Sequence, residues 1–145
     1  MLIEMLSGIW IADKKIMNNT AFIQDKNISG IVNCIKDLSF LKKNNEYNEY
    51  IQENIKKYEI IRFSDYLCDI TEFIYNRIKK GESIIIICQD GLEHSPYIIL
   101  AYIIRYGLVN FDIGIKMIRT KILESFKDGF KYSDVFNRFQ KKISL

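Results

Sequence analysis

Four residues near the middle of the chain have the types and spacing of a site for nucleophilic chemistry on an anion. Cys88 is followed by Gly91, His94 and Ser95 in the run CQDGLEHS. Cysteine reacts as its thiolate, which is favoured beside loop amides and the N-terminus of a helix. Gly91 allows the backbone to curl around an anion, and the Ser95 hydroxyl could cap the next helix or stabilise a leaving thiolate. The pattern therefore predicts a loop that presents a reactive thiol to an anionic group.

A buried strand and a buried helix are expected to position this loop. Ser83 to Cys88 is a continuous, mostly β-branched run, which is typical of a central strand covered by helices on both faces. Pro96 to Tyr106 is apolar almost all round and predicts a helix packed on that sheet, ending at Gly107. In open α/β sheets, ligands bind beyond the carboxyl ends of the strands. Cys88 is the last residue of the predicted central strand and therefore lies at its carboxyl end.

The other segments predict strands that alternate with helices. The polar segment Lys42 to Lys57 predicts a solvated connection with a short helix in its second half. No linker or repeat interrupts the chain, so we expect one α/β domain over residues 1–145 with a central, mainly parallel sheet. We expect further strands at Ile9–Ala12, Gly30–Ile35 and Glu59–Phe63, and helices at Thr20–Lys26 with Thr20 as cap, Ile70–Lys80 after Asp69, Asn110–Ile122 with Asn110 as cap, and Tyr132–Lys142.

The composition argues against several classes of protein. The net charge is +3 with both signs interspersed, which gives no support to a nucleic-acid partner. The three cysteines, Cys34, Cys68 and Cys88, are widely spaced and His94 is the single histidine, so neither a disulfide framework nor a metal site is expected, and no cofactor is implied. Apolar runs are too short to cross a bilayer and the N-terminus lacks the order of a signal peptide, which predicts a soluble intracellular protein, cytoplasmic or nuclear. The richness in Ile, Lys and Asn suggests an AT-rich genome, such as that of a virus or protist.

The loop and its neighbours resemble the protein tyrosine phosphatase superfamily, whose signature is His-Cys-x-x-Gly-x-x-Arg-Ser/Thr. The cysteine follows several α/β units, as in the dual-specificity phosphatases. SGIWIAD resembles that family's opening strand and turn, GIVNCI its second strand, and ILAYIIRYGLVNFDIGIKMIR its two helices after the loop. The resemblance implies a dual-specificity-phosphatase fold with Cys88 in the nucleophile position. It also implies a phosphate-binding loop of Cys88, Gln89, Asp90, Gly91, Leu92, Glu93 and His94.

The resemblance further implies a general acid upstream of the cysteine. Asp65, in RFSDYLCDI, matches its position between a predicted strand and the next helix. Asp65 could also be a simple turn residue or helix cap. Asp69 is the second choice and is more easily explained as the cap of that helix.

The departures from the signature concern charge. His94 replaces the arginine whose planar fork binds two phosphate oxygens, and imidazole is shorter and only partly protonated at neutral pH. Ile87 replaces the histidine, while Asp90 and Glu93 add negative charge beside a site for a dianion. Loss of the arginine alone should cost several kcal/mol of transition-state stabilisation, roughly a thousandfold in rate. The loop therefore predicts a phosphatase site that no longer turns over efficiently.

Three functional hypotheses remain open. The first is a pseudophosphatase that binds a protein or phosphoprotein partner, with no membrane involved. The second is a slow phosphatase for phosphotyrosine, phosphothreonine or an RNA 5′ phosphate, in which His94⁺, Arg62 or Arg119 supplies charge. The third is a thiol switch with Cys88 as redox sensor.

Simpler explanations exist for the same residues. Cys88 could be a small buried thiol at a strand end, as free cysteines often are. His94 could hydrogen-bond Glu93 or Asp90 at the entry of the helix. In the superfamily a regulatory disulfide is a known device, and Cys68, close to Asp65 in sequence, is a candidate partner for Cys88 that sequence alone cannot test.

Overall fold

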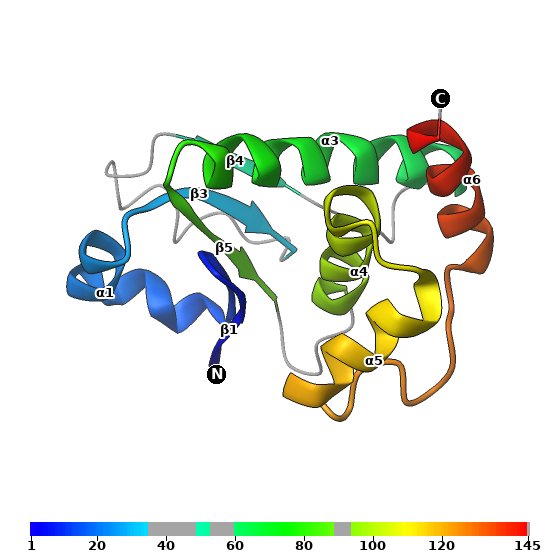
Figure 1. Ribbon diagram of the computed structural model, residues 1–145. Coiled ribbons are helices and arrows are strands. Elements are labelled where there is room, and N and C mark those ends of the chain that lie inside the picture. Colours follow the sequence, from blue (N-terminus) through cyan, green and yellow to red (C-terminus); the bar gives the residue numbers. More distant parts are fainter. Residues whose placement is uncertain (35–48, 53–59, 89–93, 145) are drawn as a thin grey trace.

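The central feature of the fold is a twisted sheet whose strands run in the order β1-β2-β5-β3-β4 (Figure 1). The computed structural model describes residues 1–34, 49–52, 60–88 and 94–144, and at 49–52 and 60–66 it describes the backbone alone. β2, β5, β3 and β4 are parallel to their neighbours, and only β1 runs antiparallel, against β2. The strands are β1 (Leu2–Leu6), β2 (Ile9–Ala12), β3 (Ile28–Asn33), β4 (Glu49–Gln52) and β5 (Ser83–Ile87). The predicted α/β class with a mainly parallel sheet is confirmed.

β5 lies in the middle of this sheet and is buried on both faces. Ile84 and Ile86 belong to the larger core cluster, whereas Ile85 and Ile87 belong to a second cluster on the opposite face. Because successive side chains of a strand point to opposite faces, a strand covered on both sides must be apolar throughout. The continuous isoleucine run has this cause, and its predicted central place is confirmed.

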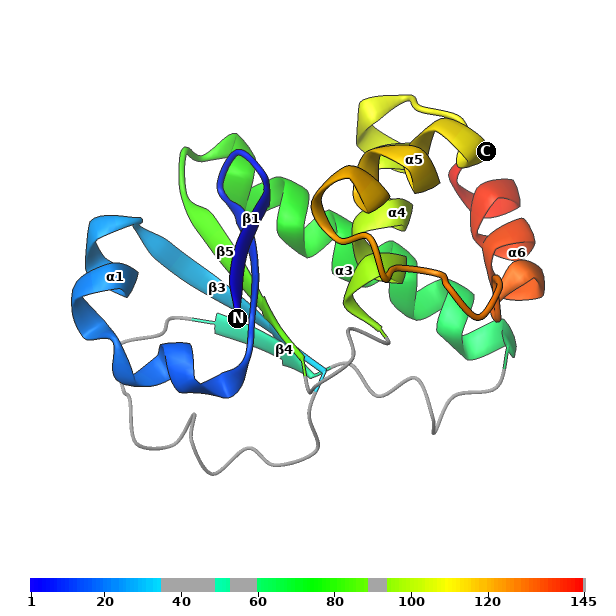
Figure 2. The same cartoon turned by 90° about the horizontal axis from the view of Figure 1, so that it is seen from below.

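The two faces are covered unequally (Figures 1 and 2). A 3-10 helix, η1 (Lys14–Asn18), and the short α1 (Thr20–Asp25) cover the smaller cluster. The larger cluster packs beneath α3 (Ile60–Lys79), α4 (Ser95–Gly107), α5 (Phe111–Lys121) and α6 (Ser133–Ile143). The helices that follow β5 therefore all pack on one side of the sheet.

Most predicted elements agree with the structure within one or two residues, but their caps differ in detail. The Asn110 side chain accepts a hydrogen bond from the Ile113 amide at 2.9 Å, so the predicted cap of α5 is confirmed. α1 is capped by Asn19, whose Oδ1 accepts from the Phe22 amide at 3.0 Å, and not by Thr20. α4 ends as expected at Gly107, and Leu108 takes the left-handed conformation that closes it.

Two predicted elements are wrong. Glu59–Phe63 was expected as a strand, but residues 60–63 form the first turn of α3. The helix is therefore much longer than the predicted Ile70–Lys80, and its buried residues Leu67, Ile70 and Ile74 recur at helical spacing.

The second half of 42–57 was expected to hold a short helix and instead contains β4. β4 lies at the sheet edge, where a polar sequence is compatible with a strand.

Candidate active site

Cys88 lies directly after the carboxyl end of β5, between its two neighbouring strands. Its amide donates to the Ala12 carbonyl at 3.0 Å, on the β2 side, and the preceding Ile87 carbonyl accepts from the Cys34 amide at 2.8 Å, on the β3 side. The residue is 2% exposed and belongs to the core cluster beneath α3 to α6. The strand thus holds the predicted nucleophile position at the place where α/β sheets bind ligands.

The Cys88 thiol is placed to donate a hydrogen bond. Its Sγ lies 3.8 Å from the Ala12 carbonyl oxygen, which can only accept. A carbonyl oxygen favours the protonated thiol and repels a thiolate. In the arrangement observed, this contact works against the ionised form that nucleophilic chemistry requires.

The start of α4 offers few amides to an anion. His94 is half-buried, and its carbonyl accepts from the amides of Tyr97 and Ile98 at 3.1 and 3.3 Å. Pro96, in the first turn, has no N–H to offer. The His94 side chain makes no capping hydrogen bond within the described residues. The positive end of the helix is therefore present, but much of its donor capacity is already used or missing.

Ser95, the first residue of α4, has a buried hydroxyl. The residue is fully buried, and no group in the described part of the chain lies within hydrogen-bond distance of its Oγ. Ser95 is the first residue of α4 and not its cap, so the expected capping role is not observed. Buried hydroxyls normally have partners, so the lack of one among the described residues distinguishes Ser95 from Thr71, whose hydroxyl donates to the Leu67 carbonyl at 2.8 Å.

Between Cys88 and His94, the predicted phosphate-binding residues Gln89, Asp90, Gly91, Leu92 and Glu93 lie outside the described residues. The structure therefore fixes the two ends of the predicted loop, which are the end of β5 and the start of α4. Both ends agree with the motif. The roles assigned to the residues between them stay predictions.

The two acid candidates are not on a loop. Asp65 lies within α3, whose backbone is helical from Ile60, so the expected strand, loop and helix order around it is wrong. Its side chain lies outside the described part, and its role as general acid stays a prediction. Asp69 is an exposed residue of the same helix interior and cannot be the cap that was expected.

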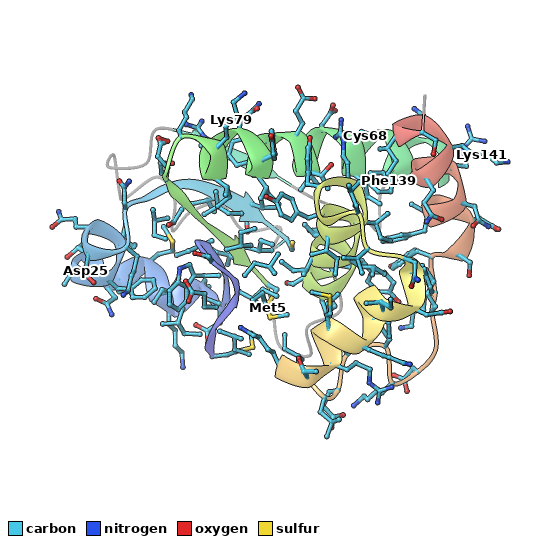
Figure 3. All side chains as sticks on the ribbon, in the orientation of Figure 1. Met5, Asp25, Cys68, Lys79, Phe139 and Lys141 are labelled. Carbon is cyan, nitrogen blue, oxygen red and sulfur yellow. The ribbon has the colours of Figure 1, made fainter. Side chains whose placement is uncertain are left out.

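Cys68 is a residue of α3 and lies beside the last turn of α4, whereas Cys88 precedes the first turn of α4. Its carbonyl accepts from Arg105 Nη1 at 2.8 Å, and Arg105 is in the last turn of α4, whereas Cys88 precedes the first. At 1.5 Å per residue, Ser95 and Arg105 are about 15 Å apart along the helix axis. Figure 3 shows Cys68 on α3. Burial raises the pKa of its thiol. The geometry gives no support to a disulfide between Cys68 and Cys88.

The basic candidates are not assembled into a phosphate clamp by the described contacts. Arg119 is exposed in the last turn of α5, and the side chain of Arg62 lies outside the described part. Lys121, in the same turn as Arg119, donates its Nζ to the Glu4 carbonyl of β1 at 2.7 Å. This hydrogen bond holds the Lys121 side chain at β1, which is an edge strand of the sheet.

An aromatic cluster beside the helix entry was not predicted. Tyr97, in the first turn of α4, packs against Phe126 and Tyr132 with ring centroids 5.1 and 4.7 Å apart. Its hydroxyl oxygen accepts from the Lys131 amide at 3.1 Å. The segment between α5 and α6 is therefore fixed against the helix that begins at the candidate site. The density of aromatic residues from 126 to 136 was the available sequence signal.

Within the described residues, His, Cys, Asp and Glu do not gather in groups of three or more that could hold a metal ion. No described helix combines the length and apolar character needed to cross a bilayer.

Comparisons with known proteins agree with this geometry. The model of the dual specificity phosphatase catalytic domain matches residues 9–142. Similar solved structures include a leucine rich repeat and phosphatase domain containing protein from Entamoeba histolytica, with a TM-score of 0.73, 16% identity, and coverage of 99% of this chain and 92% of that one. The human tyrosine phosphatase-like serine/threonine/tyrosine-interacting protein has a TM-score of 0.72, 16% identity, and coverage of 99% and 95%.

A mouse dual specificity phosphatase described as putative, complexed with zinc tungstate, has a TM-score of 0.68, 11% identity, and coverage of 99% and 86%. These identities are low, so the structures support the fold alone. Among curated proteins, no match was found. Because the family model spans nearly the whole sequence, this chain belongs to the dual specificity phosphatase family.

Proposed function

We propose that this chain is a catalytically impaired dual specificity phosphatase homologue that acts by binding a protein or phosphoprotein partner. The observation that carries the proposal is His94 at the start of α4, where the family signature has arginine. An arginine there would bind two phosphate oxygens in a fixed fork and stabilise the charge of the transition state. Imidazole offers one donor toward a ligand and cannot replace that contact.

The environment of Cys88 supports the same conclusion. Its Sγ lies 3.8 Å from a carbonyl acceptor, Ala12 O, a contact that favours thiol over thiolate. This contact and the missing clamp would act on the same step, which is attack on the phosphorus atom. A binding module derived from an enzyme needs the fold of that enzyme but does not need an efficient catalytic site. We place its partner inside the cell, where thiols remain reduced.

The test compares wild type with His94→Arg, His94→Gln and Cys88→Ser in the hydrolysis of p-nitrophenyl phosphate. Wild type should be indistinguishable from Cys88→Ser, because neither can complete the attack at a useful rate. His94→Arg should gain Cys88-dependent activity if the rest of the site is intact, and His94→Gln should not. Cys88-dependent turnover by the wild type at rates typical of the family would overturn the proposal.

Binding is tested directly with fluorescent phosphotyrosine and phosphothreonine peptides and their unphosphorylated counterparts. Saturable binding of either form without phosphate release supports a binding function. Phosphate release from the labelled peptide by wild type but not by Cys88→Ser would contradict it.

A slow phosphatase is the second candidate, and the Ser95 hydroxyl is the observation that favours it. Ser95 Oγ is buried at the helix entry with no hydrogen-bond partner among the described residues, as expected of a group kept for an anion or a leaving thiolate. If protonated His94 supplies the charge, activity should rise as the pH falls through the range in which imidazoles gain a proton. That activity should disappear in Cys88→Ser.

A further inference from the structure

We propose that the groove between the edge strand β1 and helix α5 is a docking site for a partner protein. The partner segment that fits it inserts a large apolar side chain into the groove and places a neighbouring carboxylate against lysines of α5. This surface lies away from Cys88, so the proposal goes beyond the proposed function and holds whether or not the catalytic site is impaired.

The groove is mainly apolar and has adaptable walls. It encloses about 310 Å³, which is at the lower end of the range of ligand-binding clefts. Figure 3 shows Met5 on the side of β1 that faces α4 and α5. Methionine is unbranched and fits its shape to an inserted group, and it occurs on two walls of this groove. The side chains that line it from β1, α4 and α5 in turn include Met5, Leu6, Ile99, Ile103, Met117 and Lys121.

An exposed apolar stripe on α5 leads into the groove. Ile113 and Met117 are 50% and 40% exposed, although the same helix buries Gly114 and Ile118. Ile113, Met117 and Lys121 are spaced four residues apart, so they follow one side of the helix. A side chain inserted beside Met117 would remove this apolar surface from water, which is the main driving force for association.

Lys121 fixes a positive charge at the rim of the groove. Its Nζ donates to the Glu4 carbonyl at 2.7 Å. An ammonium group has three donors, and the contacts in the described part of the chain use one of them. The Glu4 carboxylate accepts from the Gly8 amide at 3.3 Å and forms no ion pair with Lys121. The Lys121 charge is therefore held in place without a described carboxylate to neutralise it.

Lys116 adds a second positive charge on the same side of α5. It lies one turn before Thr120, which also lines the groove, and no carboxylate among the described residues pairs with it. A lysine in the last turn, such as Lys121, complements the helix dipole, but Lys116 lies in the middle of α5, where the dipole does not account for it. Two lysines beside an apolar groove favour a partner segment that carries carboxylates.

Two other occupants fit this groove less well. A strand added to the edge of β1 would need the Glu4 carbonyl, which already accepts from Lys121, and lysines at sheet edges disfavour such pairing. A second copy of the chain in a two-fold arrangement would use the same patch on both subunits. That arrangement would bring the lysines of the two grooves together, and their like charges would oppose it.

The groove lies toward the end of the sheet opposite to Cys88. Leu6 pairs with Ile9, and Ile9 pairs with Ile84 near the start of β5. Cys88 is four positions after Ile84, which corresponds to about 13 Å along a strand. A segment in the groove would therefore dock without entering the candidate active site.

A phage-displayed library of random peptides, which carries no phosphate, tests the groove without involving the Cys88 loop. The full chain captures phage, and each enriched peptide is synthesised with a fluorescent label and titrated by fluorescence polarisation. Enriched peptides should combine a large apolar residue with a nearby Asp or Glu. Their affinity should fall by about tenfold or more in Met117→Asp and in Lys121→Glu, because these changes remove the apolar contact and reverse the charge at the rim. Added salt should also weaken binding.

Matched variants separate the charge at the groove from general effects. Arg119 is two residues from Met117 and therefore lies on the opposite side of α5. Arg119→Glu changes the net charge by the same amount as Lys121→Glu and should leave the affinity nearly unchanged. Lys121→Arg should retain binding. Lys116→Glu disturbs no described contact, so a loss of affinity in this variant cannot come from unfolding. Urea unfolding followed by far-UV circular dichroism checks the fold of each variant.

Several outcomes would overturn the proposal. They are a selection that enriches no peptide, enriched peptides without acidic residues, and unchanged affinity in folded Met117→Asp and Lys121→Glu. A wild-type dimer in light scattering that Met117→Asp dissociates would also overturn it, because a second copy would then be the occupant. No readout involves phosphate release, so failure here is distinct from failure of the proposed function.

Discussion

At the residue scale, two buried hydroxyl groups differ in how well their hydrogen-bonding capacity is used. Thr71 Oγ1 donates to the Leu67 carbonyl at 2.8 Å and accepts from Arg105 Nη1 at 3.0 Å, which ties α3 to α4. Ser125 is 2% exposed, and its Oγ has no partner in the described part of the chain. A buried polar group without a partner destabilises the folded state, whereas one that is hydrogen-bonded between two helices stabilises it.

Removing these two hydroxyls should therefore have opposite effects. Ser125→Ala should raise the free energy of unfolding by on the order of 1 kcal/mol, because an unsatisfied group is lost. Thr71→Val keeps the shape but removes one of the two acceptors of Arg105 Nη1, the other being the Cys68 carbonyl, and should lower the free energy of unfolding by about 1–3 kcal/mol. Urea unfolding followed by far-UV circular dichroism measures both. A destabilised Ser125→Ala would show that its hydroxyl is hydrogen-bonded after all.

The candidate site shows which residue roles a sequence can reveal. Cys88 and Ser95 could be placed from sequence because a strand, a short loop and a helix fix their relation within one local segment. Asp65 could not, because its setting depends on where α3 begins, and packing of Leu67 and Ile70 on the distant core decides that. The place of Cys34 beside Cys88 comes from strand register, which local sequence does not specify.

At the element scale, α4 and α5 pack closely because of one glycine. A β-carbon at Gly114 would lie 2.7 Å from Leu100 Cδ1 and 3.3 Å from Ile103 Cδ1, both on α4. A helix interior disfavours glycine by about 1 kcal/mol relative to alanine. The close approach of the two helices offsets that cost. Because Leu100 is fully buried, it has little space into which to move.

Gly114→Val should consequently lower the free energy of unfolding by about 1–3 kcal/mol through overpacking. Leu100→Ala alone should cost about 2–5 kcal/mol. The double variant should lose less than the sum of the two single losses, since the smaller side chain leaves room for the new methyl groups. Urea unfolding of the two single variants and the double variant gives the coupling between the sites. Strictly additive effects would mean that Gly114 and Leu100 are not in close contact.

Elements with strong apolar patterns were predictable, and those determined by neighbours were not. β5 and α4 are buried all round, so their composition alone indicated their type and place. β4 has the polar sequence EYIQ and exists because its backbone pairs with β3 at the edge of the sheet. The EIIRF segment has strand-forming residues, but residues 60–63 extend a helix that tertiary packing stabilises.

At the scale of the whole molecule, the sheet couples two cores that lie on its opposite faces. Trp10, the single tryptophan, packs against Phe22 on the side of α1, with ring centroids 5.0 Å apart. Tyr102 and Tyr106 of α4 pack on the other side, at the α3–α4 contact. Because β5 contributes side chains to both clusters, disruption of one core should unfold the other, and Trp10 should report it.

Alkaline pH provides the test of this coupling. Burial raises the pKa of the Tyr102 hydroxyl above its ordinary value of 10.0, and it also raises the pKa of Tyr106. The fold thus favours the neutral phenols, so their contribution to stability is fully present below about pH 10 and is lost as the pH rises through the folded-state pKa. The free energy of unfolding should therefore fall as the pH rises above about 10. In Tyr102→Phe that fall should be smaller. Trp10 fluorescence and far-UV circular dichroism in urea should give the same midpoints, and an earlier loss of circular dichroism at high pH would show that the two faces unfold separately.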